Sequence, residues 1–333
     1  MEADRGFPQP ASAGDDGLMG ASGERLPRAS STTEARGPDG RAPMDVFSSK
    51  PGSPPRVHRA RRDIARLYDG KVNTERFDIY ATIIRGLNTA ALEAQDPPPE
   101  LLIAADGDVS IFYAPFDAVN QGAEIILAGI TPGRTQMNES LRAASRLLAS
   151  GVPNAIVLNG AKEEASYAGP MRKPLVRMLD HFQIHNILGI PTSAELFGTS
   201  RHLVHYTSAL RYPVFVKGKY YKGSPAMTRH PLLRRYLLEH FAAELQELPR
   251  ALVIPLGDKL SESIEFIAEH RQIGRERILS GLEHPSGANS ERVAYLIGRK
   301  ERGKLSAQVR PERIDRARSA LEAKVAALLN RSS

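Results

Sequence analysis

The sequence contains neither cysteine nor tryptophan among its 333 residues. The absence of cysteine excludes disulfide bonds, thiolate catalysis and any zinc or iron–sulfur site that depends on thiolate ligands. Long apolar runs are missing too, since the longest, such as residues 124–130, are far too short to span a bilayer. The N-terminus lacks the basic start and apolar core of a signal peptide. We therefore expect a cytoplasmic protein with no membrane association.

Charge and hydrophobicity indicate a globular protein with a polyanionic partner. Hydrophobic residues make up 41% of the chain, which is enough for a sizeable core. The formal net charge is +7, and much of the excess lies in residues 299–331, which hold ten Lys and Arg against four Asp and Glu. Such a run is either a solvated helix face or a nucleic-acid contact, and composition alone does not decide between them.

Three regions differ in their pattern. Residues 1–60 are rich in Gly, Pro, Ala, Ser, Asp and Arg without helical or strand periodicity, which predicts a disordered N-terminal tail. Residues 61–300 form the predicted domain, which begins with one or two helices within residues 62–93. Residues 301–333 predict a basic C-terminal helix packed on that domain, because apolar residues recur every three or four positions.

Short apolar segments alternate with amphipathic helical patterns through the domain. The predicted strands are 124–130, 155–158, 204–208, 251–256 and 278–282, and the predicted helices cover about 139–149, 171–183, 230–247, 258–270 and 290–299. This alternation predicts an α/β fold, a three-layer α/β/α sandwich with a short, mainly parallel central sheet. In such sheets ligands bind beyond the carboxyl ends of the strands, so we expect the chemistry in the loops that follow them.

Two motifs occupy loops of this kind. Gly129-Ile-Thr-Pro-Gly133 follows the first strand of the predicted sheet, and its glycines allow the backbone to approach a ligand closely. His284-Pro-Ser-Gly287-Ala-Asn289 follows the last strand, where an imidazole fixed by a proline can face an anionic leaving group. Each motif alone has an ordinary explanation, as a tight turn or a packed histidine. The two motifs together, one after the first strand and one after the last, are a more specific indication of a functional site than either alone.

With these motifs the sequence resembles the uracil-DNA glycosylase superfamily, in particular its bacterial-type members without an iron–sulfur cluster. Gly129–Gly133 and His284–Ser286 match the family's turn after the first core strand and its His-Pro-Ser loop. Segments 166–171, 206–213 and 232–256 resemble, in order, the stacking-aromatic segment, the base-reading strand and the helix and strand that follow. The resemblance extends over about residues 110–300.

The resemblance implies a uracil-DNA glycosylase-like fold and a monofunctional DNA glycosylase. Such an enzyme flips uracil or another deaminated or damaged base out of single- or double-stranded DNA and hydrolyses its bond to the sugar. It implies His284 as the donor to the leaving base and Thr131 beside the attacking water. The implied base-binding residues are Gly129, Ile130, Tyr167, which stacks on the base, and Ser208, which reads its edge.

The expected partner is DNA, bound by a monomer in the cytoplasm at the nucleoid. A basic segment with interleaved tyrosines, residues 217–222, is predicted in the loop after the Ser208 strand, on the ligand side. The predicted DNA contacts are Gly133, Lys217, Lys219, Ser286, Gly287, Asn289 and Arg292. No metal or organic cofactor is expected, although His181 with His185 and His202 with His205 have ligand-like spacing.

Three positions depart from the family's usual pattern. Thr131 stands where many members have Asp or Asn, and its hydroxyl can hold a water but cannot act as a base near neutral pH. Ser208 replaces a base-reading Asn with one short hydroxyl. Ala288 is too small to fill an emptied base stack. Alternative carboxylates for orienting the water are Asp117, Glu163 and Glu164.

These departures leave other functions open. A family member with lost or reduced catalysis would act as a DNA- or damaged-base-binding module. A hydrolase of free nucleosides or nucleotides is a third possibility, and it would need no basic surface.

Overall fold

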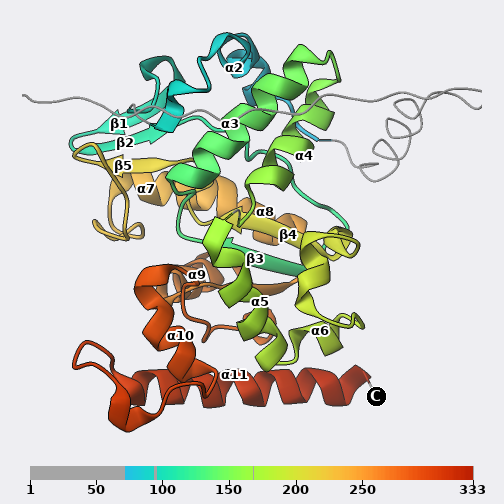
Figure 1. Ribbon diagram of the computed structural model, residues 1–333, viewed down its shortest axis with the longest axis vertical. Helices are drawn as coiled ribbons and strands as arrows, with labels where there is room; N and C mark the ends of the chain where they lie inside the picture. The colour runs from blue at the N-terminus through green and yellow to red at the C-terminus, as the bar shows by residue number, and fades with distance from the viewer. Residues whose placement is uncertain (1–71, 94–95, 168, 333) are drawn as a thin grey trace, which may run out of the picture. The chain divides into compact units, whose positions relative to one another are not determined.

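The computed structural model describes residues 72–93, 96–167 and 169–332, all of which belong to the unit Pro54–Ser333. The predicted N-terminal tail, and the part of the first predicted helical region before residue 72, lie outside the described residues. The described part is a mixed α/β fold with one parallel and one antiparallel sheet (Figure 1).

The parallel sheet has the strand order β4-β3-β7. Its strands are β3 (Ile125–Gly129), β4 (Val204–Ser208) and β7 (Leu252–Pro255). Residues 278–282 extend the sheet beyond β7 through two parallel bridges, Val253 to Ile278 and Leu256 to Leu282. Because all four segments run in one direction, the loops that follow them begin at the same edge.

Helices cover both faces of this sheet, because alternate strand residues belong to two separate hydrophobic clusters. Ile126 and Val253 face one cluster, whereas Ile125 and Ile254 face the other. The first cluster is built with α2 (Glu75–Gly86), α3 (Arg134–Ala149), α4 (Asn154–Ala165), α7 (Pro231–Tyr236), α8 (Ala242–Glu247) and α9 (Asp258–Arg271). The second is built with α5 (Arg172–His181), α6 (Ile184–Ile187), α10 (Ser290–Leu296) and α11 (Pro311–Ser332).

Shorter helical turns connect these elements. A π-helical turn, Leu237–Phe241, joins α7 to α8. Single 3-10 turns occupy Ala91–Glu93, Pro99–Leu101, Gly169–Met171, Ser193–Phe197, Arg201–Leu203, Arg275–Arg277, Gly287–Asn289 and Arg302–Lys304.

The antiparallel sheet has the order β1-β2-β5-β6 and was not predicted from the sequence. Its strands are β1 (Leu102–Asp106), β2 (Val109–Phe112), β5 (Val214–Val216) and β6 (Lys219–Tyr220). The last two, with three and two residues, are too short to show an alternation. The chain passes from the parallel to the antiparallel sheet between β4 and β5, within residues 209–213. This crossing borders the candidate site described below.

Three sequence predictions are corrected by the structure. Residues 155–158 are not a strand but part of α4, where buried Val157, Leu158, Ala161 and Ala165 recur at helical spacing. The predicted strand 278–282 contributes only the two bridges. Lys217 and Lys219 do not lie in an open loop but in the tight β5–β6 hairpin, where Lys217 and Gly218 both have a positive φ, as such turns require.

The C-terminal helix α11 packs against α6 and α10, and runs below them in the view of Figure 1. Its residues Ile314, Leu321 and Val325 are buried. Several of its basic residues serve this packing: Arg318 Nη2 donates to the Tyr295 carbonyl, and Lys324 Nζ donates to the Ile278 carbonyl at 2.8 Å. Part of the basic run is therefore engaged within the fold. Among the described helices, none combines the length and apolarity that crossing a bilayer requires.

Candidate functional site

The two sequence motifs lie along one edge of the parallel sheet. Gly129–Gly133 leaves the carboxyl end of β3, and His284 follows Leu282, which bridges to Leu256 at the end of β7. With β7 between them, the two loops begin about 10 Å apart, which is two strand spacings. The structure therefore places both motifs at the edge where ligands bind in open α/β sheets.

His284 is held in a defined orientation and protonation form. The backbone N–H of Ser286 donates to Nδ1 at 3.3 Å, so the neutral ring carries its proton on Nε2. Burial lowers the pKa of His284, which favours the neutral ring near pH 7. Gly257 adopts a φ of +92° beside it, and a Cβ at Gly257 would lie 3.5 Å from the His284 Cβ. Nε2 has no partner among the described residues and remains a donor for a ligand.

The residues after His284 form a local polar network. Asn289 Nδ2 donates to Ser286 Oγ at 3.3 Å, and Arg292 Nη1 donates to Asn289 Oδ1 at 3.4 Å. Gly287 and Ala288 are exposed beside them. The structure thus gathers the four predicted phosphate contacts of this loop at one place, next to His284.

A partly buried ion pair holds this loop against α11. Glu283 is 5% exposed and pairs with Arg313 of α11, which also pairs with Asp258 at the start of α9. Burial raises the pKa of Glu283, although Arg313 opposes that rise. The orientation of the His284 loop therefore depends on α11.

Thr131 is engaged by the backbone of the loop after β4. Its Oγ1 donates to the Tyr212 carbonyl at 3.0 Å and accepts from the Val214 amide at 3.2 Å. Since a hydroxyl has one proton, Thr131 has none left to donate to a water. Thr131 therefore holds the loop after β4, residues 209–214, against the Gly129–Gly133 turn through these two hydrogen bonds.

Two further residues of the Gly129–Gly133 turn also form hydrogen bonds with the loop after β4. The carbonyls of Gly129 and Ile130 accept from the amides of Ala209 and Leu210 at 2.8 and 2.9 Å. The Gly133 amide, a predicted phosphate contact, donates instead to Gln136 Oε1 at 3.1 Å. The Gly129–Gly133 turn and the loop after β4 therefore form one rigid wall of the site.

A small cavity of about 20 Å³ lies beside this wall. Tyr167 and Ser208, two predicted base-binding residues, line it together with Pro132. Lys162 and Arg211 line it as well, although neither was singled out from the sequence. A space of this size holds one water. A base enters it only after a lining side chain has moved.

Tyr167, which lines this cavity, has an unfavourable backbone conformation and, within the described part of the chain, an unpaired hydroxyl. It is 4% exposed with a φ of +48°, a region that aromatic residues rarely adopt. Its ring packs on Tyr206 with the ring centroids 5.6 Å apart, and its buried hydroxyl has no partner among the described residues. Both features raise the free energy of the side chain where it stands. Displacing Tyr167 would relieve both of these costs.

Replacing Tyr167 by phenylalanine is expected to stabilise the protein. The substitution removes an unsatisfied buried hydroxyl, a gain of about 1 kcal/mol in the free energy of unfolding. Tyr206→Phe is the matched control, because the Tyr206 hydroxyl donates to the Leu196 carbonyl at 2.7 Å and its loss is destabilising. Urea denaturation of both variants measures the difference. Equal destabilisation by the two changes would show that the Tyr167 hydroxyl has a partner.

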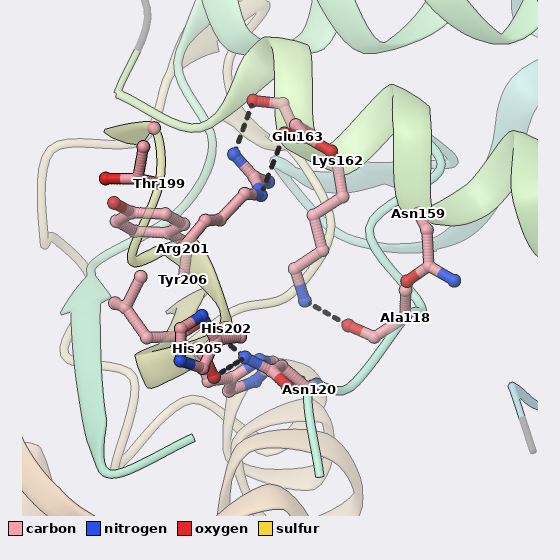
Figure 2. A pocket seen from close by; sticks show the side chains of 12 residues that line it. Ala118, Asn120, Asn159, Lys162, Glu163, Thr199, Arg201, His202, His205 and Tyr206 are labelled. Carbon is pink, nitrogen blue, oxygen red and sulfur yellow. Dashed lines mark hydrogen bonds and ion pairs between the residues drawn. The ribbon is translucent and has the colours of Figure 1, made fainter. Parts of the chain in front are cut away.

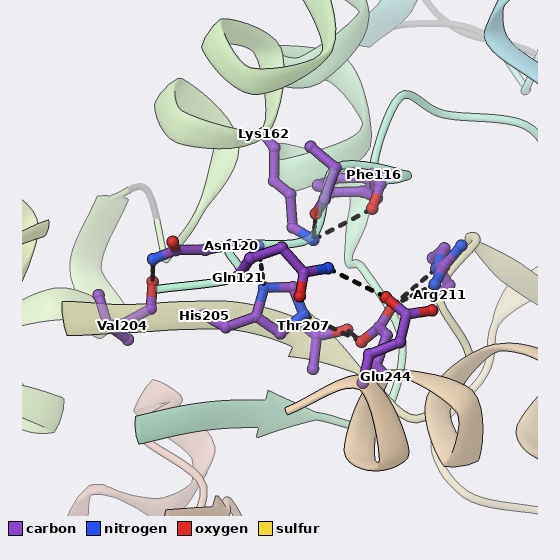
Figure 3. Close-up of polar contacts among 11 residues, drawn as sticks. Phe116, Asn120, Gln121, Lys162, Val204, His205, Thr207, Arg211 and Glu244 are labelled. Atoms are coloured by element: carbon purple, nitrogen blue, oxygen red, sulfur yellow. Dashed lines mark hydrogen bonds and ion pairs between the residues drawn. The ribbon is translucent and has the colours of Figure 1, made fainter. Parts of the chain in front are cut away.

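Behind the cavity lies a buried polar network centred on Glu244 of α8, which is 0% exposed (Figure 3). One carboxylate oxygen accepts from Thr207 Oγ1 at 2.5 Å and from His205 Nε2 at 3.1 Å. The other accepts from Arg211, through Nε at 2.7 Å and Nη2 at 2.5 Å. All of the donors come from β4 or the loop that follows it.

The protonation states within this network follow from burial and charge. Burial alone would raise the pKa of Glu244, but Arg211 and His205 hold that pKa far below its ordinary value. Burial lowers the pKa of His205 to about 4, and the Asn120 amide donates to its Nδ1 at 3.4 Å, so the ring is neutral and donates through Nε2. Burial also lowers the pKa of Lys162 to about 8. The network holds a carboxylate, a guanidinium and a neutral imidazole at pH 7.

Stability is expected to fall on acidification from pH 6.5 towards pH 4. Burial lowers the pKa of His240 to about 4, as it does for His205, and the nearby Arg211 and Arg76 lower it further. Because the unfolded chain then binds more protons than the folded one, each such histidine costs up to about 1.4 kcal/mol per pH unit in this window. His240→Phe retains the ring packing on Tyr212 and Tyr236 and should flatten the slope. Urea denaturation across this pH range measures the slope, and an unchanged slope in the variant would contradict the assignment.

A second, larger hollow of about 280 Å³ lies against the beginning of β4 (Figure 2). Figure 2 shows Lys162 and Arg201 entering it from opposite sides. Arg201 pairs with Glu163 at 3.2 Å and lies over the Tyr206 ring. Its lining residues include Glu163, one of the alternative carboxylates, and the histidine pair His202 and His205, but none from the Gly129–Gly133 turn or the His284 loop.

The remaining sequence candidates are placed elsewhere. Asp117 accepts from the hydroxyls of Tyr113 and Tyr212, and Glu164 pairs with Arg146, so neither lines the small cavity. Lys217 pairs with Asp108 at 3.3 Å on the exposed hairpin. Among the described residues, no group of three or more His, Asp or Glu side chains is arranged to hold a metal ion.

Fold and site together define a mixed α/β protein whose candidate site lies at the carboxyl edge of a small parallel sheet. The chain belongs to the family of the uncharacterized protein YoxB of Bacillus subtilis (strain 168), to which it is 36% identical over 208 residues. The match covers 62% of this chain and 80% of YoxB. No family model matches the chain, and no solved structure matches it.

Proposed function

We propose that this protein is a monofunctional DNA glycosylase of the uracil-DNA glycosylase type, which acts on DNA as a cytoplasmic monomer. The observation that carries the proposal is the placement of the Gly129–Gly133 turn and the His284 loop at one carboxyl edge, with His284 Nε2–H free to donate. The helices on both faces of the parallel sheet support a three-layer architecture of that type. The strand order, with β3 central, places both motifs beside β7.

The reaction would proceed in the order that the chemistry requires. The bond between the sugar C1′ and the base nitrogen breaks, and its electron pair leaves with the base. A neutral His284 donates a hydrogen bond from Nε2 to an oxygen of the base and stabilises that charge. The oxygen of a water then bonds to C1′, and the proton that the water loses neutralises the base.

A cleavage assay tests the proposal. End-labelled oligonucleotides with uracil, hypoxanthine, xanthine or a thymine mismatch, single- and double-stranded, are incubated with the protein and then treated with alkali. Strand breaks at one of these bases support a glycosylase and identify its substrate. Free mononucleosides at varied salt serve as the comparison, because salt-insensitive activity on them alone would indicate a nucleoside hydrolase.

A specific observation favours a second function, that of a DNA- or damaged-base-binding module. The Thr131 hydroxyl is committed to the backbone, and no carboxylate lines the small cavity, so the described residues offer no evident group to activate a water there. Binding of the same oligonucleotides without strand breaks under any condition would support this second function.

A further inference from the structure

Two cationic side chains line the small cavity beside Ser208. Lys162 and Arg211 line it, and none of its lining residues is an Asp or a Glu. Lys162 is 6% exposed and donates from Nζ to the carbonyls of Phe116 at 3.1 Å and Ala118 at 2.5 Å. Two cationic groups beside a space for one water favour an oxygen with negative charge as its occupant.

Arg211 is fixed in place more firmly than an exposed arginine. Its Nε and Nη2 both bond to the fully buried Glu244, and the side chain is 13% exposed. Its backbone lies between Leu210, whose amide bonds to the Ile130 carbonyl, and Tyr212, whose carbonyl accepts from Thr131. A guanidinium that is held on one side by a carboxylate presents its other side in a constant direction.

The unbonded side of Arg211 is its Nη1 group, which has no partner among the described residues. Ser208, the residue predicted to read the base, lines the same cavity but offers a single neutral hydroxyl. A charged, preorganised donor stabilises developing negative charge far better than a neutral hydroxyl does. The site thus contains a stronger group for this task than the residue that the sequence pointed to.

We propose that Arg211 binds an oxygen of the flipped base through Nη1 and stabilises the negative charge that the base acquires as its bond to C1′ breaks. Glu244 is the positioning residue, which acts through Arg211. The base enters the small cavity as Tyr167 moves aside, and its oxygen then occupies the space that is large enough for one water. This inference rests on the proposed glycosylase function and adds to it a charge-stabilising residue besides His284.

The test compares Arg211→Lys with Arg201→Lys in the full chain. Arg201 is a matched control because it pairs with a glutamate, as Arg211 does, but lines the other hollow. The measurements are the single-turnover cleavage rate on the oligonucleotide that the wild-type protein cleaves fastest, the Kd for that oligonucleotide, and circular dichroism. Arg211→Lys should lower the rate about 10²-fold with little change in Kd, because the interaction develops in the transition state. Arg201→Lys should leave the rate unchanged.

Rescue separates a contact with the base from a merely structural role. Millimolar guanidinium should restore part of the activity of Arg211→Ala by occupying the emptied place, and should leave Arg201→Ala unaffected. If Arg211→Lys does not fold, the double variant Arg211→Met with Glu244→Gln removes the buried charge pair together and gives the same comparison.

The outcomes distinguish the two proposals. Equal rates for Arg211→Lys and Arg201→Lys, or the absence of guanidinium rescue, would overturn the role of Arg211 while cleavage by the wild-type protein leaves the glycosylase function standing. No cleavage of any oligonucleotide by the wild-type protein would overturn the glycosylase function, and the role of Arg211 with it.

Discussion

The proposed glycosylase activity is expected to fall by about 10²- to 10³-fold when His284 is replaced by alanine, the usual effect of removing one donor to a developing anion. The reason lies in the fixed ring: the Ser286 amide occupies Nδ1, which leaves Nε2–H as the donor at the carboxyl edge. The effect should fall on kcat more than on KM, because the charge on the base develops only as its bond breaks. Single-turnover kinetics on the identified substrate measure it.

His202→Ala is the control for this prediction. The His202 side chain is exposed, and its backbone carbonyl, which accepts from Asn120 Nδ2 at 2.9 Å, is unaffected by the change. Thermal unfolding of both variants should stay close to that of the wild-type protein. A His284→Ala rate equal to the wild-type rate would show that another group bears the charge of the leaving base.

Replacing Glu244 by alanine is expected to have the largest effect on stability. The change leaves Arg211 without its carboxylate and removes the acceptor of His205 and Thr207, all within the core. Removing one partner of a buried ion pair costs about 3–5 kcal/mol, because the remaining charge stays desolvated. The midpoint of thermal unfolding should fall by roughly 10 °C.

Glu247→Ala, one turn further along α8, is the control. Its carboxylate is exposed and accepts only a 3.2 Å hydrogen bond from Gln121 Nε2 among the described contacts, so a change below about 0.5 kcal/mol is expected. If Glu244→Ala were no more destabilising than Glu247→Ala, the buried network would not contribute to stability.

The parallel strands were predictable from the sequence because each is a buried apolar run with turn residues after it. Residues 125–129 and 252–255 lie within the predicted ranges, and 204–208 matches its prediction. In the antiparallel sheet, β5 and β6 were missed because three and two residues are too few for a period to be seen, and β1 because Leu102–Asp106 shows no apolar–polar alternation. Residues 155–158 were misread because four apolar or small residues in a row fit a buried strand and a buried helix equally well.

The site was predictable only where its residues belong to a local motif. His284 and the glycine turn stand out in the sequence, and the structure places both at one edge. Glu244 and Arg211 are 33 positions apart in the sequence, and a contact between residues so far apart produces no local sequence pattern. One hint was present in the helix, where Glu244 lies three residues after buried Phe241 and next to buried Leu245, on a face that should be apolar. Thr131 was placed correctly in a turn, but its partners on the crossing chain could not be foreseen.

The ion pair between Arg313 of α11 and Glu283 couples local unfolding of α11 to the order of the His284 loop. Arg313 joins Glu283 to the start of α9, and Gly281 lies so close to α11 that an added Cβ would be 2.8 Å from the Ala317 carbonyl oxygen. If α11 detached, Glu283 would lose its cation, and the loop would lose the packing that sets its path. We therefore expect detachment of the helix and disordering of the His284 loop to be one cooperative event, in which amide hydrogens of both segments exchange with solvent at a common rate.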